Sequence, residues 1–202
     1  MNTASADWLW HLTGPDLGDV RNVVLLLLLL VAAVIDVRTL RIPNWLTVTG
    51  ALIGLALSAA VQWQVLGVAW AVDGALWSLA GLAAGLALML PFYALRVMGA
   101  GDVKLMAMVG AFLGLPQIVP AVICVFIAGG VVALAAAAWR HSLGRVASNV
   151  FGIVQSMAFA VLAGVRPAPA MPPAGSVGRL PYGISICAGT LAWLIASHLR
   201  LA

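Results

Sequence analysis

The sequence predicts an all-α fold, a polytopic membrane bundle of about six transmembrane helices. Hydrophobic residues make up 64% of the 202 residues and charged residues only 8%, a balance that no soluble domain of this size needs for its core. The sequence contains several apolar runs whose lengths approach or exceed the roughly 20 residues needed to cross a hydrocarbon core about 30 Å thick. The ten basic residues lie singly between these runs, which argues against a nucleic-acid partner.

Six apolar segments are expected to form the helices. Pro43 and Asn44 break the chain after the first segment and offer a cap for the second, and residues 115–117 are expected to make a tight turn. Glycines four residues apart predict close packing of helices in lipid. The expected helices are residues 22–37, 45–61, 74–95, 103–115, 117–139 and 182–199, and the glycine pairs are Gly50 and Gly54, Gly81 and Gly85, and Gly110 and Gly114.

The basic residues predict the orientation, because cytoplasmic loops retain Lys and Arg. With a periplasmic N-terminus, only Arg21 and Arg200 fall outside. Residues 1–21 then form an acidic periplasmic tail, which lacks the basic start of a signal peptide. Residues 22–202 form one membrane-embedded domain. The residues expected on the cytoplasmic side are Arg38, Arg41, Arg96, Lys104, Arg140, Arg145, Arg166 and Arg179.

Residues 146–165 are long enough to cross the membrane but carry polar side chains on one helical face. This pattern favours an amphipathic helix lying on the cytoplasmic surface. The alternative, a seventh crossing, would export Arg166 and Arg179. Residues 166–180 are rich in Pro, Ala and Gly and are expected to form a flexible loop.

Two of the six aspartates are candidates for chemistry, and the chain has no glutamate. Asp36 ends an apolar run at the cytoplasmic end of the first helix, where an ionised carboxylate is costly and usually functional. Its alternative role is a boundary residue paired with Arg38 or Arg41. Asp102 stands just before the fourth segment on the same membrane face, where its alternative role is an N-cap. Asp73 is expected to cap the third helix.

The pairing of Asp36 with Asp102 predicts acid and base catalysis. Two carboxylates in a low-dielectric site do not both ionise readily, so one keeps its proton. The ionised member can take a proton from water while the protonated member polarises a peptide carbonyl, which requires neither metal nor cofactor. Gly99 and Gly101 remove side chains beside Asp102, where another backbone could approach. The dispersed histidines lack the spacing of a zinc site.

Residues 36–47 and 99–105 resemble the type IV prepilin peptidase family. The first stretch reads D-x-R-x-x-x-I-P-N and includes Pro43 and Asn44, and the second carries the family's GxGD signature with Lys104 two positions later. Residues 180–183 resemble the proline-containing start of the family's last span. Lys104 is expected either to position a carboxylate or the substrate backbone, or to reach the membrane surface as a topogenic charge.

The resemblance implies an aspartic peptidase whose catalytic pair is Asp36 and Asp102. Its substrates would be prepilin-like precursors, type IV or Flp pilins or pseudopilins, cut after a glycine at the cytoplasmic face of the bacterial inner membrane. Pilus assembly or secretion machinery would be the associated partners. The chain lacks the paired cysteines of larger members that also methylate the new terminus, so it resembles the compact Flp/Tad form without methyltransferase activity.

Two other classes remain open from the residues alone. Intramembrane carboxylates also serve as proton relays, which would fit a proton-coupled transporter or a channel component, although no inverted repeat is apparent. A structural subunit of a secretion machine would need neither aspartate. Cys124 and Cys187 lie inside apolar runs and are expected to be small buried hydrophobes.

Overall fold

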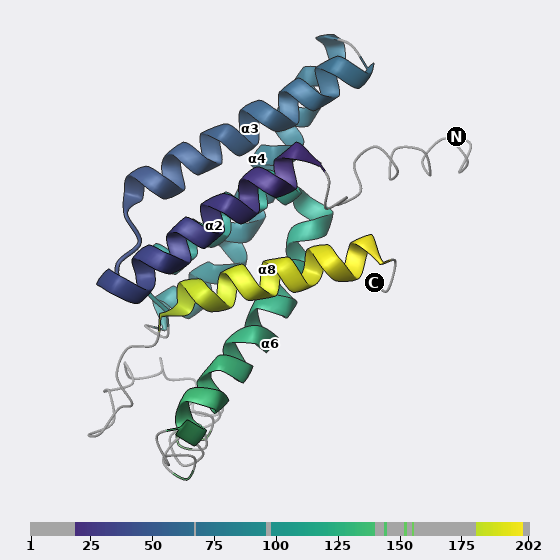
Figure 1. Cartoon of the computed structure of the whole chain (residues 1–202). Helices are drawn as coiled ribbons and strands as arrows, with labels where there is room; N and C mark the ends of the chain where they lie inside the picture. The colour runs from purple at the N-terminus through teal and green to yellow at the C-terminus, as the bar shows by residue number, and fades with distance from the viewer. Residues whose placement is uncertain are drawn as a thin grey trace.

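The computed structural model describes residues 19–66, 68–95, 98–139, 144, 152, 155 and 181–199, and this part of the chain is helical with no strand (Figure 1). The all-α prediction is confirmed, and each of the six expected segments overlaps one helix. The predicted tail before residue 19 and the predicted loop at 166–180 lie outside the described residues. So does nearly all of the predicted surface helix at 146–165. The helices are α2 (Val20–Thr39), α3 (Asn44–Leu66), α4 (Val68–Ala94), α5 (Ala100–Leu113), α6 (Leu115–Trp139) and α8 (Tyr182–His198).

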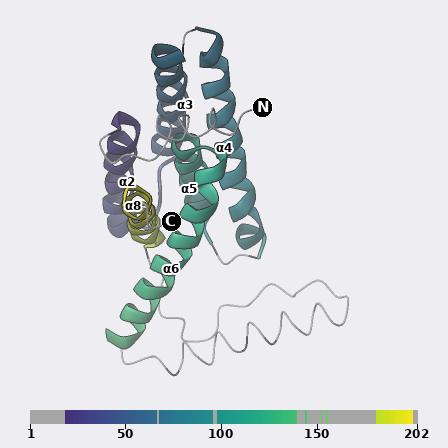
Figure 2. The same cartoon turned by 90° about the vertical axis from the view of Figure 1, so that its right-hand side faces the viewer.

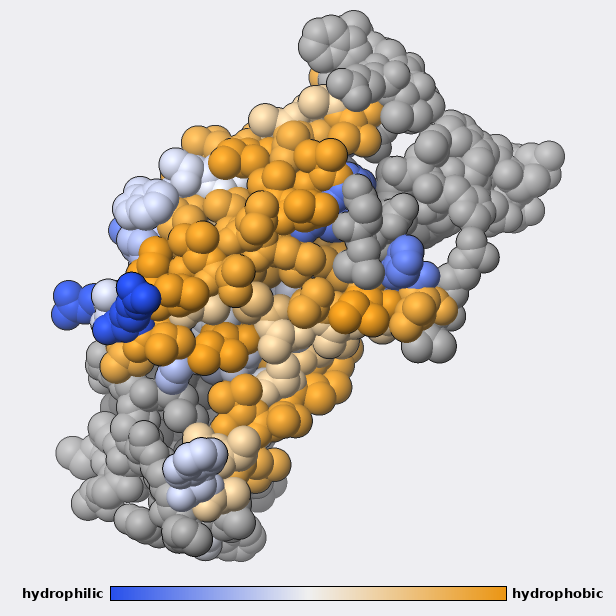
Figure 3. Space-filling model, viewed as in Figure 1, coloured by the Kyte–Doolittle hydropathy of each residue, from blue (hydrophilic) through white to orange (hydrophobic). Residues whose placement is uncertain are grey.

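Four of these helices are long and apolar enough to cross a membrane, namely α2, α3, α4 and α6. At about 1.5 Å per residue, the 20 residues of α2 cover roughly the thickness of a hydrocarbon core. The other two are shorter, with 14 residues in α5 and 17 in α8. Figure 3 shows continuous hydrophobic surface along the flanks of the bundle, which in lipid would face acyl chains.

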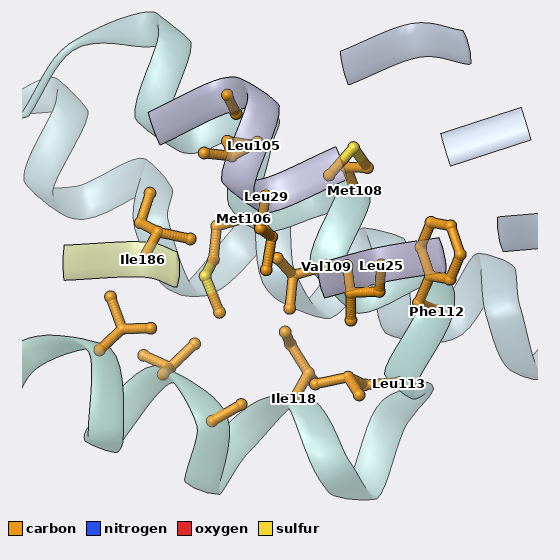
Figure 4. Packing of buried hydrophobic residues seen from close by; sticks show 14 of the residues in the cluster. Leu25, Leu29, Leu105, Met106, Met108, Val109, Phe112, Leu113, Ile118 and Ile186 are labelled. Carbon is orange, nitrogen blue, oxygen red and sulfur yellow. The ribbon is translucent and has the colours of Figure 1, made fainter. Parts of the chain in front are cut away.

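Helix α5 forms the centre of the bundle. It contacts all five other helices, and Figure 2 shows it between the α3–α4 pair and the α2–α8 pair. Every residue from 105 to 114 is buried. Leu29 of α2, Met106 of α5 and Ile186 of α8 point toward one another in this core (Figure 4). A helix that is apolar on all sides is expected to be enclosed by others, which explains how so short a helix is accommodated.

Glycines bring α4 and α5 into backbone contact. A Cβ atom at Gly81 would overlap the carbonyl oxygen of Gly110, and one at Gly85 would lie 2.6 Å from the carbonyl oxygen of Met106. The hydroxyl of Ser78 donates a 2.6 Å hydrogen bond to the carbonyl oxygen of Ala111 across the same contact. The predicted role of the glycine pairs in packing is therefore confirmed. The remaining predicted glycines lie against side chains: Gly50 against Met108, Gly54 against Phe112 and Gly114 against Trp77.

The break between α5 and α6 lies at Gly114, earlier than the predicted turn at residues 115–117. Gly114 has a φ of 78°, a conformation that favours glycine. Pro116 falls inside the first turn of α6, where a backbone N–H would have no helical partner in any case. The prediction located the connection but assigned the break to the wrong residue.

Two predicted helix starts also differ from the structure. Helix α4 begins at Val68, so the exposed Asp73 lies in its second turn and does not cap it. Helix α2 begins at Val20 and is capped by Asp19, whose carboxylate accepts a 2.9 Å hydrogen bond from the backbone N–H of Arg21. Asp19 also forms an ion pair with the Arg21 side chain at 2.6 Å, so the predicted boundary at residue 22 is two residues late.

Candidate active site

One end of the bundle brings the two motif stretches, residues 36–47 and 99–105, into a single region. The C-terminal end of α2 lies beside the N-terminal ends of α3 and α8 at the left of Figure 1, and α5 begins at the same end. Hydrophilic residues collect at this end, in contrast to the apolar flanks (Figure 3). The two predicted catalytic aspartates are brought together here, Asp36 from α2 and Asp102 from α5.

Asp36 is buried and is held by a helix far away in sequence. Its side chain is 5% exposed, and its Oδ2 accepts a 2.8 Å hydrogen bond from the backbone N–H of Gly183 in α8. The N-cap of α8 is Pro181, which makes no side-chain capping bond, so Asp36 satisfies an N–H that the helix itself leaves unpaired. Within the described ranges Asp36 forms no ion pair with Arg38 or Arg41, whose side chains are exposed, so the alternative of a boundary ion pair is wrong.

Asp102 lies in the first turn of α5, outside the four helices long enough to span. Its Oδ2 accepts a 3.2 Å hydrogen bond from the backbone N–H of Gly99, which is the N-cap of the helix. The predicted N-cap position for Asp102 is therefore wrong by three residues, although the carboxylate does satisfy a backbone group at the start of the helix. A Cβ atom at Gly99 would lie 3.3 Å from that oxygen, so glycine leaves room for the folded-back carboxylate.

The connection after α2 packs against the first turn of α5. A Cβ atom at Gly101 would lie 3.2 Å from the Cβ of Ile42 and 3.6 Å from its backbone nitrogen. Glycine at 101 thus admits another segment closely, as predicted, but the segment is the protein's own chain just before Pro43. The contact joins the stretch that contains Asp36 to the stretch that contains Asp102.

Lys104 and Asn44 form a second link between the two stretches. The Lys104 ammonium donates a 2.9 Å hydrogen bond to Oδ1 of Asn44. Asn44 is the first residue of α3, and its side-chain oxygen serves this interhelical bond. In the described part of the chain, the hydrogen bond of Lys104 goes to Asn44 and not to either aspartate, so its observed role is to tie α5 to α3.

The two carboxylates lie close enough for the charge of Asp36 to affect Asp102. Burial raises the pKa of Asp102 from an ordinary value of 3.8 to about 6, the hydrogen bond from Gly99 opposes this rise, and the charge of Asp36 adds to it. The tyrosine Tyr182, next to Gly183 at the start of α8, also lies near enough to interact with the Asp102 charge. Among the described residues, no three His, Cys, Asp or Glu side chains gather as a metal site would require.

Two residues of this region were not among the predicted site residues, Tyr182 and Gly183. A backbone N–H leaves no signature in composition or periodicity, so the contact of Gly183 with Asp36 was not accessible from spacing. The available signal was the resemblance of residues 180–183 to the start of the family's last span, which carried no assigned role.

The fold and this region define a class, helical membrane proteins with two interacting carboxylates at one end of the bundle. A family model described as the type IV leader peptidase family matches residues 23–134, more than half of the 202 residues. The chain therefore belongs to the type IV leader peptidase family, as the resemblance of its two motifs predicted. The match includes both aspartates, whereas α8 lies beyond it. Searches of curated proteins and of solved structures found no match.

Proposed function

We propose that this protein is a membrane aspartic endopeptidase that removes the leader peptide from prepilin-like precursors. The observation that carries the proposal is the placement of Asp36 and Asp102, two carboxylates from different helices, at one end of the bundle, where Gly183 bonds Asp36 and the adjacent Tyr182 lies near Asp102. Membership of a leader peptidase family supports the choice of substrate. Carboxylates that share a site in this way are the arrangement that divides acid and base roles between two like residues.

The proposed reaction needs no group beyond the two carboxyls and water. Ionised Asp36 takes a proton from water while the water oxygen attacks the scissile carbonyl carbon. At the same time, protonated Asp102 gives its proton to the carbonyl oxygen. Asp36 then passes its proton to the amide nitrogen, Asp102 recovers a proton from the tetrahedral intermediate, and the C–N bond breaks. Both residues return to their starting states. The raised pKa of Asp102 favours the protonated state that this scheme assigns to it.

The site is proposed to face the cytoplasm of a bacterial inner membrane, with the N-terminal end of α2 toward the periplasm. Arg38, Arg41 and Lys104 lie on or between the elements that form the site, and Lys and Arg favour the cytoplasmic side. Precursors of type IV or Flp pilins or of pseudopilins are the proposed substrates, and pilus assembly or secretion machinery the proposed partners. N-methylation is not part of the proposal.

Co-expression with a precursor whose basic leader ends in glycine before an apolar helix tests the proposal. We expect Asp36→Asn and Asp102→Asn each to leave the precursor uncut while the variant still inserts and is monodisperse in detergent. Asp73→Asn is the matched control, because Asp73 is exposed on α4, and it is expected to cleave normally. Cleavage by either site variant would remove that residue from the mechanism. If the wild type cuts no precursor but carries proton flux in liposomes that depends on Asp36, the transporter alternative would replace the proposal.

A further inference from the structure

The start of α8 contacts Asp36 in a way that neither the family match nor the reaction scheme includes. The backbone N–H of Gly183 is 2.8 Å from Oδ2 of Asp36, although 147 positions separate the two residues. Gly183 is buried and is the second residue of α8, where a helix has no internal partner for its N–H groups. The bond therefore links Asp36 to α8, a helix that lies outside the matched residues 23–134.

Glycine is the residue that permits this approach. A Cβ atom at position 183 would lie 3.0 Å from Oδ2, 3.1 Å from Cβ and 3.4 Å from Cγ of Asp36. Contacts this tight would displace the carboxylate by a few tenths of an ångström. The same geometry explains why the backbone, and not a side chain, serves as the donor.

The contact also fixes the position of the Asp36 carboxylate. A hydrogen bond donated to a carboxylate is stronger when the carboxylate is ionised, and the first turn of a helix carries partial positive charge. The titratable groups at this end of the bundle include Asp102 and Lys104 from α5 and Tyr182 from α8, and the Lys104 ammonium bonds to Asn44. Arg38 and Arg41 are exposed, and the described side chains of α3 include no titratable group.

We propose that Gly183 is a positioning residue whose backbone N–H holds the carboxylate of Asp36 oriented toward the water, which makes Asp36 the base and Asp102 the acid. The inference rests on the proposed peptidase function. In this arrangement α8 completes the active site without touching the scissile bond.

The kinetic test compares Gly183→Ala with Gly130→Ala in the purified full-length protein, using a precursor of the kind described above. Among the residues that the structure describes, a Cβ atom at Gly130 in α6 meets nothing within 4 Å, so this control is expected to match the wild type. Gly183→Ala is expected to lower kcat on the order of tenfold with little change in KM, because a small displacement of a reacting group is costly.

Hydrogen exchange provides a readout that does not depend on activity or on the folding of the glycine variant. The Gly183 amide is expected to be protected in the wild type and in Asp102→Ala, and to exchange at least roughly tenfold faster in Asp36→Ala, which lacks the acceptor. Equal protection in Asp36→Ala and the wild type would overturn the inference, as would an unchanged kcat in a folded Gly183→Ala. These results would leave the peptidase proposal standing if the wild type cleaves. Failure of the wild type to cleave any precursor would instead count against the proposed function.

Discussion

Asp36 and Asp102 lie at the same end of the bundle, but a distant helix holds the first and its own helical turn holds the second. Asp36 is buried and accepts its hydrogen bond from Gly183 of α8. Asp102 is half-buried and accepts its bond from Gly99, three residues earlier. The position of Asp36 thus depends on how α2 and α8 pack, whereas α5 can set the position of Asp102 alone.

This difference gives the two carboxyls different tasks in the proposed reaction. A buried carboxylate that accepts a short bond from a helix N-terminus is held in one position, which suits a base that must meet a water molecule. A carboxyl that is desolvated, with a longer hydrogen bond at the helix start, retains its proton to a higher pH. Two residues of the same type therefore differ because their surroundings differ.

The largest expected effect is on cleavage by variants that neutralise either carboxyl. Asp36→Asn and Asp102→Asn are each expected to lose activity by a factor on the order of 10² to 10⁴, the usual contribution of a general acid or base. The double variant is expected to be no slower than the worse single variant, because the two residues act as a unit. Initial rates on a purified precursor measure this. Losses that multiply in the double variant would show that the two residues act independently.

The pH dependence of cleavage is expected to follow the protonation of Asp102. Its raised pKa means that the folded protein keeps this proton above the ordinary value of 3.8 and loses it above about 6. If protonated Asp102 is the acid, kcat is expected to fall roughly tenfold per pH unit well above pH 6. Rates measured between roughly pH 5 and 8 would reveal the falling limb. A profile that rises through this range would assign the acid role to another group.

Alanine substitutions at Asp36 and Asp102 are expected to have different effects on stability, although both residues are needed for activity. Asp36→Ala leaves the buried Gly183 N–H without its acceptor and is expected to lower the free energy of unfolding by about 1–3 kcal/mol. Asp102→Ala removes a desolvated carboxylate beside the exposed Gly99, where water can replace the bond, so above pH 6 its expected cost is under about 1 kcal/mol. Thermal unfolding in detergent compares them, and equal losses would refute the contrast.

The smallest expected effect concerns the bond between Lys104 and Asn44, which ties α5 to α3 beside the site. Both residues are exposed, so water competes with their hydrogen bond. Lys104→Met and Asn44→Ala are each expected to lower stability by less than about 1 kcal/mol and to retain cleavage. A loss of cleavage in Lys104→Met as large as that in Asp102→Asn would instead give Lys104 a direct role with the carboxyls or the substrate.

The helices and the aspartates could be predicted from the sequence because both depend on local patterns. Apolar runs of the right length mark α2, α3, α4 and α6, and a lone carboxylate at the end of such a run marks Asp36. Proximity of Asp36 and Asp102 followed from the expected orientation of the helices and from the family motifs. The same patterns misplaced the break at Gly114, because proline can occupy the first turn of a helix as readily as the turn before it.

The contacts that assemble the site could not be predicted in the same way. The bond from Gly183 to Asp36 and the packing of Ile42 on Gly101 depend on which helices become neighbours, and periodicity does not report that. The enclosure of α5 by the other helices is also a tertiary property. Its 14 residues are too few for the sequence alone to identify a membrane span. The left-handed backbone at Leu40, with a φ of 51°, occurs at a residue that rarely adopts it, so the sequence predicted a break near Pro43 and Asn44 but not the cap at Leu40.

Titration of the aspartate side chains by carbon-13 NMR tests most directly whether the two carboxyls form one site. The chain has only six aspartates, so the carboxyl signals of selectively labelled protein can be assigned with single variants. In the wild type, Asp102 is expected to titrate at about pH 6, and in Asp36→Asn its midpoint is expected to fall, because the neighbouring charge that helps to raise its pKa is gone. An Asp102 midpoint that is identical in the two proteins would contradict the account.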